Sequence, residues 1–480
     1  LRPRSATRDL VYNKMTTFST LLASLSPYLS DGSLLCGRSG DKDWPSDASW
    51  AEFLLALPRE DVEACERLGL HRVARVRDAA PESLRRLCAT VASASAALGR
   101  GAEGSTCSCC QSAIAASHRA FRQSAEKSEQ VSALLASASA RLELSRVRRV
   151  VDVGCGKGHL VSKLRSELGV PALGVDVDDA VLDAARATYP EVECFECRDV
   201  VAAGLPLQAG DLVVGLHPCG ALGEAIVRAV RDCARGDGES GGGGDGGSSC
   251  ALLMVPCCWH KQGSSVAARE PLSERARMLD AIAETASGND ECGVAIEDDD
   301  DATAASVTGN GGGAASTAVG GGGGMRLPLA ALKKASMALD STGSVQTRRA
   351  RHELRELLRI RGIDVSRRED MDGIHPKKAR RGLEALASEA LRLRGLPEPT
   401  EEELREAVAA ASAPFEAIRR LSLLEPTLGE LVELAALLDR ALALEEVGMG
   451  TSVFRAFDQA ASDRNLCIAS EVRAGVQHVD

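Results

Sequence analysis

The stretch Val150-Val151-Asp152-Val153-Gly154-Cys155-Gly156-Lys157-Gly158 decides the fold of this chain. A β-branched run leads into a turn with glycines at alternate positions, and a helical pattern begins directly after it. Glycine accepts positive φ and lets the backbone approach a ligand closely. The first turn of the following helix offers unpaired N–H groups to a polar or anionic ligand. The stretch therefore predicts a buried strand, a ligand-binding turn and a helix.

The residues that follow alternate between strand and helix patterns. Predicted strands lie at 172–178, 191–200, 211–220 and 250–258, with helices at 180–189 and 221–234 between them. Such alternation implies right-handed crossovers and a mainly parallel sheet with helices on its faces. Two short strand patterns near the end, 451–457 and 464–472, predict a hairpin that completes this sheet.

Composition divides the chain into five expected segments. Gly/Ser/Asp-rich blocks at 236–249 and 287–324 bury too little apolar surface to offset the entropy of ordering, so both are expected to be flexible. The expected segments are an N-terminal helical region (1–123), a core with the cofactor site (124–261), a flexible low-complexity insertion (262–324), a helical insertion (325–450) and the closing hairpin (451–480).

Overall composition limits the class of protein. The 480 residues are 44% apolar with a net charge of −11, so the chain lacks a global nucleic-acid footprint. No apolar run reaches the roughly 18 residues of a membrane span, and no membrane partner is expected. Sixteen irregularly spaced cysteines without a secretory signal favour reduced thiols in an intracellular compartment, cytoplasmic or nuclear. Leu1 rather than Met opens the sequence, so a missing start with a targeting peptide stays open.

The glycine turn fits two cofactors to different degrees. Asp176 lies 22 residues beyond Gly154, at the end of the second strand, where a carboxylate can accept hydrogen bonds from both ribose hydroxyls. The dinucleotide fingerprint G-x-G-x-x-G is not met, because Gly158 comes one residue early and position 159 is His. Asp152, two residues before the turn, suits the amino group of S-adenosylmethionine, which has no phosphates. S-adenosylmethionine is preferred over a dinucleotide and over a turn without a ligand.

A third acidic residue follows the third predicted strand. Asp199 is placed to contact the adenine amino group, although an Asp after a strand is also a common helix N-cap. The predicted cofactor-binding residues are Asp152, Gly154, Cys155, Gly156, Gly158, Asp176 and Asp199.

Three motifs resemble a known family. D-V-G-C-G-K-G-H-L (152–160), G-L-H-P-C-G-A-L (215–222) and P-C-C-W-H (256–260) are similar to methyltransferase-like protein 25 and its relatives, some of them labelled as ribosomal RNA adenine dimethylase domain proteins. The resemblance implies a Rossmann-like class I methyltransferase dependent on S-adenosylmethionine. It covers about 124–261 and 325–470, including a C-terminal Leu-Asp-Arg helix.

The chain departs from the family pattern outside these motifs. In the segment 124–131, Glu126 stands where the family usually has Lys, and Glu129 and Gln130 replace a His-Glu pair. Asp463 stands where a Pro commonly precedes Arg464. The first two changes put the role of the N-terminal segment in doubt.

The end of the fourth predicted strand reads Leu216-His217-Pro218-Cys219. Enzymes of this class that methylate adenine amino groups carry an Asn/Asp-Pro-Pro-aromatic tetrapeptide there, whose aromatic side chain stacks on the flipped base. The chain has neither the Asn/Asp nor the aromatic residue, which disfavours adenine dimethylation. His217 is the candidate catalytic residue, as a general base. A contact to cofactor or substrate and a structural role remain open for it.

Cysteines near two strand ends invite a metal or nucleophile interpretation. Cys219 as a methyl-accepting nucleophile is disfavoured, since a Cys beside Gly is more often packing. A zinc site from Cys219, Cys257, Cys258 and His260 has suitable ligand types. It is disfavoured because adjacent strand residues point to opposite faces, and no metal is expected. Trp259 either stacks on a planar substrate or packs in the core.

Two further clusters carry weaker signals. Cys107, Cys109 and Cys110 lie in a Gly/Ser-rich loop without a second ligand pair, which disfavours metal binding. The basic stretch 375–381 lacks interleaved aromatic residues, so a solvated loop is preferred over nucleic-acid contact.

The sequence thus predicts a class I methyltransferase sheet with an N-terminal helical region and a large helical insertion before the closing hairpin. The expected activity is methyl transfer to a macromolecule, RNA or protein, because the large helical additions suit a docking surface. The alternative is an inactive methyltransferase-fold protein that acts as a cofactor-binding scaffold or regulator. The missing Asn/Asp-Pro-Pro element is its main support.

Overall fold

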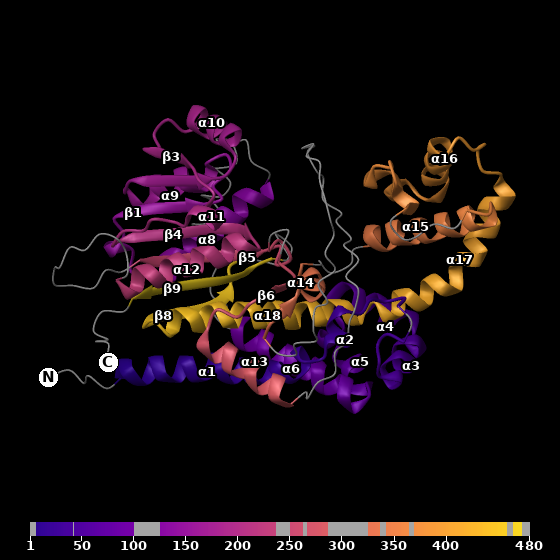
Figure 1. Cartoon of the computed structure of the whole chain (residues 1–480), viewed down its shortest axis with the longest axis horizontal. Helices are drawn as coiled ribbons and strands as arrows, with labels where there is room; N and C mark the ends of the chain where they lie inside the picture. The colour runs from indigo at the N-terminus through magenta and orange to yellow at the C-terminus, as the bar shows by residue number, and fades with distance from the viewer. Residues whose placement is uncertain are drawn as a thin grey trace.

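The computed structural model describes residues 6–41, 43–99, 125–236, 250–262, 266–286, 325–336, 342–363, 369–457 and 464–472. A seven-stranded sheet lies in the left half of Figure 1. The strands are β1 (Arg149–Val153), β2 (Ala172–Asp176), β3 (Cys194–Cys197), β4 (Asp211–Cys219), β5 (Ala251–Cys257), β8 (Met449–Arg455) and β9 (Leu466–Val472).

The strand order is β3-β2-β1-β4-β5-β9-β8. Strands β1 to β5 are parallel, while β9 runs antiparallel to β5 and β8 antiparallel to β9. The order reverses between β1 and β4, so ligands are expected at the carboxyl ends of these strands. This mostly parallel α/β sheet, closed by a hairpin, confirms the predicted Rossmann-like class I methyltransferase fold.

Helices cover both faces of the sheet because the strands alternate apolar side chains to each face. Val151, Val213 and Met254 belong to one buried cluster, and Val150, Val214 and Leu253 to another on the opposite face. The helices that connect or flank the parallel strands are α8 (Ala125–Arg141), α9 (His159–Leu168), α10 (Asp179–Thr188), α11 (Val200–Ala203) and α12 (Ala221–Arg235).

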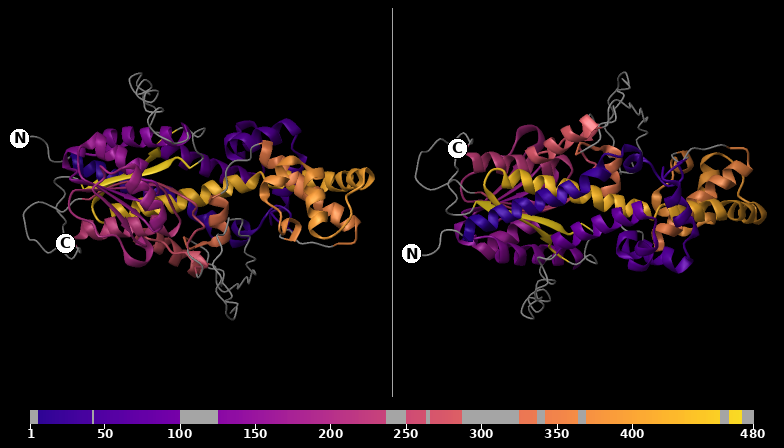
Figure 2. Two further views of the ribbon diagram at one scale, coloured as in Figure 1. Left: turned by 90° about the horizontal axis from the view of Figure 1, so that it is seen from above. Right: turned by 90° about the horizontal axis from the view of Figure 1, so that it is seen from below.

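The N-terminal helices and the insertion share one of these clusters. Helix α18 is the centre of that cluster, and its residues from Leu431 to Glu445 are all buried. Helix α1 runs alongside α18 in the view from below in Figure 2. Segments separated by about 400 residues in the sequence are therefore parts of one hydrophobic core. The N-terminal helices are α1 (Ala6–Leu29), α2 (Gly32–Cys36), α3 (Ala48–Ala56), α4 (Arg59–Leu68), α5 (Ala74–Ala79) and α6 (Glu82–Gly99), with the short η1 (Leu70–Arg72).

A smaller core lies in the insertion, apart from the sheet. Leu354, Leu357, Leu386 and Leu391 are among its fully buried side chains. It forms a lobe that stands apart from the sheet in Figure 1. Its elements are α15 (Thr342–Ile360), η3 (Glu369–Met371), η4 (Pro376–Arg381), α16 (Leu383–Leu393) and the first half of α17 (Glu401–Leu421), and α17 leads into α18 (Leu424–Glu445).

Part of the segment expected to be flexible is structured. Residues 266–286 form β6 (Ala268–Arg269) and α13 (Glu274–Ala286), and β6 pairs with β7 (Leu327–Pro328), which precedes α14 (Leu329–Ala335). The Gly-rich composition of 262–324 concealed a short buried stretch in which Ala268, Arg269 and Leu272 are all nearly inaccessible. Residues 237–249 and 287–324 lie outside the described residues.

One pair of cysteines departs from the expectation of reduced thiols, whereas the other ten cysteines of the described residues are free. Cys233 and Cys250 are disulfide-bonded, with their Cα atoms 6.6 Å apart. Helix α12 runs back along the sheet, so its C-terminal end lies beside the start of β5. The two cysteines are 17 residues apart in the sequence, and the sequence pattern did not indicate that they are close in space.

Among the described helices, none has the length and apolar character needed to cross a bilayer.

Candidate functional site

The glycine turn lies between β1 and α9, at the carboxyl edge of the sheet. Gly154, Gly156 and Gly158 all have positive φ, of 75°, 52° and 78°. The Gly154 and Cys155 N–H groups donate to the Val175 carbonyl of β2, at 2.8 and 3.1 Å. These bonds fix the turn against the neighbouring strand, and the helix begins directly after Gly158.

The glycines of this region have different surroundings. A Cβ at Gly156 would meet no atom within 4 Å, so open space lies above this position. A Cβ at Gly158 would lie 3.0 Å from the Phe195 ring, and one at Gly174 only 2.6 Å from it. Gly156 therefore leaves room for a ligand at the backbone, whereas Gly158 and Gly174 permit close packing of helix and strands.

Asp176 ends β2 beside this open space. Its Oδ2 accepts a hydrogen bond from the Gly156 N–H at 2.9 Å, and its Oδ1 accepts one from the Asp178 N–H at 3.1 Å. The carboxylate thus lies against the glycine turn, where the sequence placed it.

Asp152 is buried in β1, with 2% of its surface exposed. Burial, and then the negative charges of Asp152 and Asp176, raise the pKa of Cys155 above its usual range. The Cys155 thiol therefore stays protonated, and two carboxylates lie near the same turn. This arrangement suits a ligand with a cationic group and hydroxyls.

Asp199 acts as the N-cap of α11. Its Oδ1 accepts hydrogen bonds from the Val201 and Ala202 N–H groups, at 3.0 and 3.1 Å. The helix-cap role that the sequence left open is therefore present. The exposed position at the carboxyl edge also leaves a contact to a ligand geometrically open.

His217 lies in an irregular part of β4. The pairing with β5 shifts register between Leu216 and Cys219, and His217 has a φ of 65°, a conformation unusual outside glycine. Its Nε2 lies 3.2 Å from Oε1 of the buried Gln130 on α8. Its ring also meets Phe457 edge-on, with 6.4 Å between the centroids. Gln130, one of the departures from the family pattern, therefore contacts the candidate catalytic histidine.

Three cysteines meet beside His217. The Sγ atoms of Cys219, Cys257 and Cys258 all lie within 4.8 Å of one another, and those of Cys219 and Cys257 are 3.5 Å apart. The sequence-based objection to this grouping is wrong, because β5 ends at Cys257 and Cys258 has a φ of 45°. The alternation of faces holds only while the backbone stays extended.

The thiols of this group differ in their protonation. The hydrogen bond from Cys257 lowers the pKa of Cys219 to about 6, and the positive charge of Lys261 acts in the same direction against the effect of burial. The hydrogen bond to Cys219 and burial raise the pKa of Cys257 well above its usual range. Cys219 is therefore the thiol of this group that loses its proton most readily.

The other two residues of this motif point elsewhere. Trp259 is fully buried, with the Arg440 guanidinium 4.4 Å above its ring and Glu433 accepting from its Nε1 at 3.4 Å. Trp259 therefore packs in the core, and the alternative prediction that it stacks on a substrate is wrong. The His260 Nδ1 lies 2.8 Å from Ser336 Oγ at the end of α14, so His260 does not join the three cysteines.

A buried ionic network supports the helix that follows β4. Glu224 of α12 accepts from Arg269 of β6 at 2.6 Å and from Arg440 of α18 at 2.8 Å. Asp439 accepts from Arg269 at 2.7 Å and from the backbone of Ser273 at 2.8 Å. Burial opposes ionisation of Glu224, but the charges of Arg269 and Arg440 outweigh it and lower its pKa to about 2. The sequence analysis did not predict this network. The Leu-Asp-Arg motif at 438–440 supplies two of its residues and was the one sequence feature that pointed to it.

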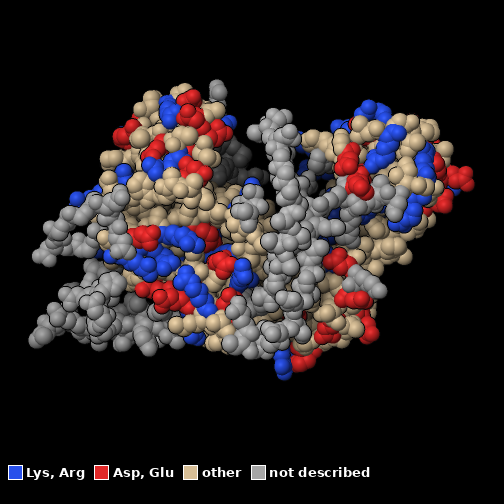
Figure 3. Space-filling view, viewed as in Figure 1, with Lys and Arg blue, Asp and Glu red and all other residues tan. Residues whose placement is uncertain are grey.

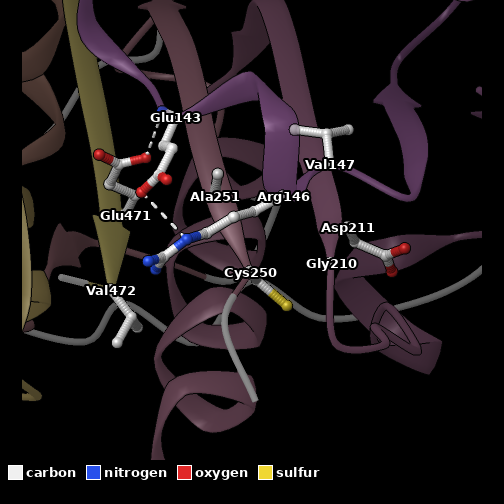
Figure 4. A pocket seen from close by; sticks show the side chains of 9 residues that line it. All are labelled: Glu143, Arg146, Val147, Gly210, Asp211, Cys250, Ala251, Glu471 and Val472. Atoms are coloured by element: carbon white, nitrogen blue, oxygen red, sulfur yellow. Dashed lines mark hydrogen bonds and ion pairs between the residues drawn. The ribbon is translucent and has the colours of Figure 1, made fainter. Parts of the chain in front are cut away.

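A shallow pocket lies at the opposite edge of the sheet, where β4 and β5 begin (Figure 4). Glu143 and Glu471 flank it, and Glu471 accepts from the Glu143 N–H at 2.8 Å. Since ligands of open α/β sheets bind at the carboxyl edge, this pocket is not the candidate site.

Residues 121–236 match a family model described as a methyltransferase domain. The trans-aconitate 2-methyltransferase of Rhizobium rhizogenes is 35% identical over 75 residues, which cover 15% of this chain and 28% of that enzyme. The chain thus aligns with less than a third of the length of this curated relative.

Solved structures are also similar to part of this chain. An amino pentose methyltransferase from Micromonospora echinaspora is 20% identical with a TM-score of 0.21, covering 30% of this chain and 56% of that one. TrmN from Thermus thermophilus is 24% identical with a TM-score of 0.19, covering 29% and 42%.

Proposed function

We propose that this chain is an S-adenosylmethionine-dependent methyltransferase that acts on a macromolecule, RNA or protein. The observation that carries the proposal is the turn itself. Open space at Gly156 lies beside the Asp176 carboxylate, at the switch point of a class I methyltransferase sheet. The match of residues 121–236 to a methyltransferase domain supports it.

The residues of the turn fit this cofactor. The buried Asp152 carboxylate would hold the amino group, and the glycines would let the methionine part approach the backbone together with Cys155. Asp176 would exchange its bond to the Gly156 N–H for the ribose hydroxyls. Asp199 uses Oδ1 for both cap bonds, so Oδ2 would accept from the adenine amino group. When bound, the cofactor supplies an electrophilic methyl group on its sulfonium.

His217 is the proposed catalytic residue at the acceptor side. The Gln130 amide fixes its ring through Nε2, and Phe457 restricts its rotation. A histidine held in this way would act as a general base for an acceptor that loses a proton on methylation. The chain lacks the aromatic residue that would stack on a flipped adenine at this place.

The position of the insertion supports a macromolecular substrate. The loop after β5 reaches α14 through His260, and α14 lies between the sheet and the lobe of α15 and α16 in Figure 1. The acceptor edge is thus flanked by the helical additions. Figure 3 shows Lys and Arg interspersed with Asp and Glu on the lobe, so this face does not by itself favour RNA over protein.

Calorimetric titration with S-adenosylmethionine tests the cofactor proposal. Asp176→Asn should weaken binding roughly 10- to 100-fold, because hydrogen bonds to a charged acceptor contribute about 1.5–3 kcal/mol each. Asp183→Asn removes a nearby exposed carboxylate on α10, paired with Arg186 at 2.7 Å, and should leave the dissociation constant unchanged. Absence of binding to the unaltered chain would sink the proposal.

Transfer of a tritiated methyl group into cell lysate tests the substrate. Label removed by RNase indicates RNA, and label removed by protease indicates protein. His217→Ala should bind the cofactor as before and lose most of the transfer. Binding without transfer to any macromolecule would instead support the scaffold alternative.

A further inference from the structure

We propose that Cys219, Cys257 and Cys258 bind one Zn²⁺ ion through three thiolates at the acceptor edge of the sheet. Two strand ends bring these residues together, and the three sulfur atoms lie within 4.8 Å of one another. Nothing in the methyl-transfer function requires this grouping, so it stands apart from the cofactor site.

The spacing of the sulfur atoms fits a tetrahedral metal. A Zn–S distance of about 2.3 Å in tetrahedral geometry separates two sulfur ligands by roughly 3.8 Å. The Cys219 and Cys257 sulfurs are 3.5 Å apart, and the Cys258 sulfur lies within 4.8 Å of both. A disulfide would need sulfur atoms about 2.05 Å apart, so the Cys219 and Cys257 sulfurs at 3.5 Å are not bonded to each other.

Backbone contacts hold the two segments that carry the cysteines against each other. The Gly220 N–H donates to the Cys257 carbonyl at 3.2 Å, and the Ala221 N–H donates to the Lys261 carbonyl at 2.8 Å. A Cβ at Gly220 would lie 1.9 Å from the Lys261 oxygen, so the loop after β5 packs directly on the turn after β4. This close contact presents all three thiols from a fixed frame, as a preformed metal site requires.

Exposure and charge also suit a metal site better than core packing. Cys257 is buried, whereas Cys219 and Cys258 are only half-buried, which gives an ion a path to the sulfur atoms. Zn²⁺ with three thiolates carries one net negative charge, and the partial exposure of Cys219 and Cys258 lets solvent stabilise that charge. Binding would release the thiol protons to solvent.

Three protein ligands leave one position of the tetrahedron open. The His260 Nδ1 contacts Ser336, and no other His, Asp or Glu of the described residues joins the group. A water molecule or a substrate thiol or carboxylate would complete the coordination, as in zinc sites that retain an exchangeable ligand.

Metal analysis of the full chain, purified under reducing conditions, tests the proposal. We expect about one zinc per chain, and replacement by Co²⁺ should give a thiolate-to-cobalt charge-transfer band together with visible bands of tetrahedral cobalt. Each of Cys219→Ser, Cys257→Ser and Cys258→Ser should weaken zinc binding at least roughly 100-fold, because loss of an outer-shell partner alone costs about 10- to 100-fold.

Two controls separate this site from other cysteines. Cys194→Ser replaces an exposed cysteine on β3 and should retain the zinc. A triple Ser variant of Cys107, Cys109 and Cys110, which lie outside the described residues, should retain it too. Thermal unfolding monitors the folding of every variant, and the cobalt spectrum of the unaltered chain does not depend on any variant.

Three outcomes would overturn the proposal. The first is protein that was purified with zinc supplied and still contains much less than one zinc per chain. The second is zinc that stays bound after each of the three single substitutions but is lost from the triple Ser variant of Cys107, Cys109 and Cys110. The third is a Cys219–Cys257 disulfide that mass spectrometry finds in the chain purified under reducing conditions. None of these outcomes affects S-adenosylmethionine binding, which is measured separately.

Discussion

At the scale of single residues, the acceptor edge depends on one glycine. Gly220 has a φ of 47° and a ψ of −114°, a conformation that other residues avoid. The backbone of Lys261 fills the space where a side chain would begin. Because the nearest atom is the carbonyl oxygen of Lys261, it cannot rotate away as a side chain would.

Gly220→Ala should therefore destabilise the protein strongly. We expect a loss of about 3 kcal/mol or more in the free energy of unfolding, from overpacking together with backbone strain. Gly169→Ala is the matched control, since Gly169 also has positive φ (66°) but open space around its Cβ position. It should cost only about 1 kcal/mol. Equal losses in denaturant unfolding would show that the contact with Lys261 is unimportant.

At the scale of elements, buried charges join parts of the chain that the sequence separates. Arg269 of β6 connects Glu224 of α12 to Asp439 of α18, and all three side chains are almost inaccessible. A buried ion pair adds little net stability over apolar residues, but removal of one partner leaves a charge uncompensated. The network thus specifies how the insertion docks on α12.

Arg269→Met should expose this dependence. We expect a loss of about 3–5 kcal/mol, because Glu224 and Asp439 lose the cation between them. Arg59→Met, at an exposed ion pair with Glu63 on α4, should cost less than about 1 kcal/mol. Urea unfolding of both variants measures the difference, and comparable losses would contradict a structural role for the network.

Helix α18 also carries a carboxyl group with an altered proton affinity. Burial raises the pKa of Glu433 to about 7, against the attraction of Arg464. The folded chain therefore holds a proton that the unfolded chain has lost above its ordinary pKa of about 4.3. Stability from this group is present below that value and declines as pH rises to about 7.

Glu433→Gln should remove this decline. Relative to the unaltered chain, the variant should gain on the order of 2–3 kcal/mol between pH 4.5 and 7, and the difference should then stay constant. Thermal unfolding across this pH range measures it. Glu384→Gln, an exposed position on α16, controls for loss of one acid. A pH-independent difference for Glu433→Gln would refute the assignment.

At the scale of the whole molecule, the N-terminal helices are not a separable appendage. Helices α1 and α6 pack against α18, which itself covers one face of the sheet through α12 and β8. A domain boundary near residue 123 therefore does not divide the hydrophobic core, even though composition and the break in pattern suggest one there.

A chain that begins at residue 125 should fail to fold cooperatively. It would expose apolar surface of α18, because α18 packs against α1 and α6 and its residues there are buried. We expect binding of a hydrophobic dye and loss of near-ultraviolet dichroism, with helical content largely retained. A single sharp thermal transition in this shortened chain would show that the sheet and insertion form an independent core.

The sequence by itself determined the parts that follow from local pattern. Alternation of strands and helices, the glycine spacing and the acid after β2 predict a mainly parallel sheet and the ligand-binding turn, because these features depend on residues near one another in the chain. Asp176 ends β2 beside the glycine turn, as the spacing predicts. The predicted closing hairpin is also present as β8 and β9.

Only the tertiary structure decided which distant residues meet. The grouping of Cys219 with Cys257 and Cys258 depends on a backbone that leaves the extended conformation at one residue, which periodicity cannot show. The burial of Trp259 against Arg440 likewise depends on packing between segments about 180 residues apart. Local preference fixes elements, whereas contacts across the core are chosen by the burial of surfaces that form only when the whole chain has folded.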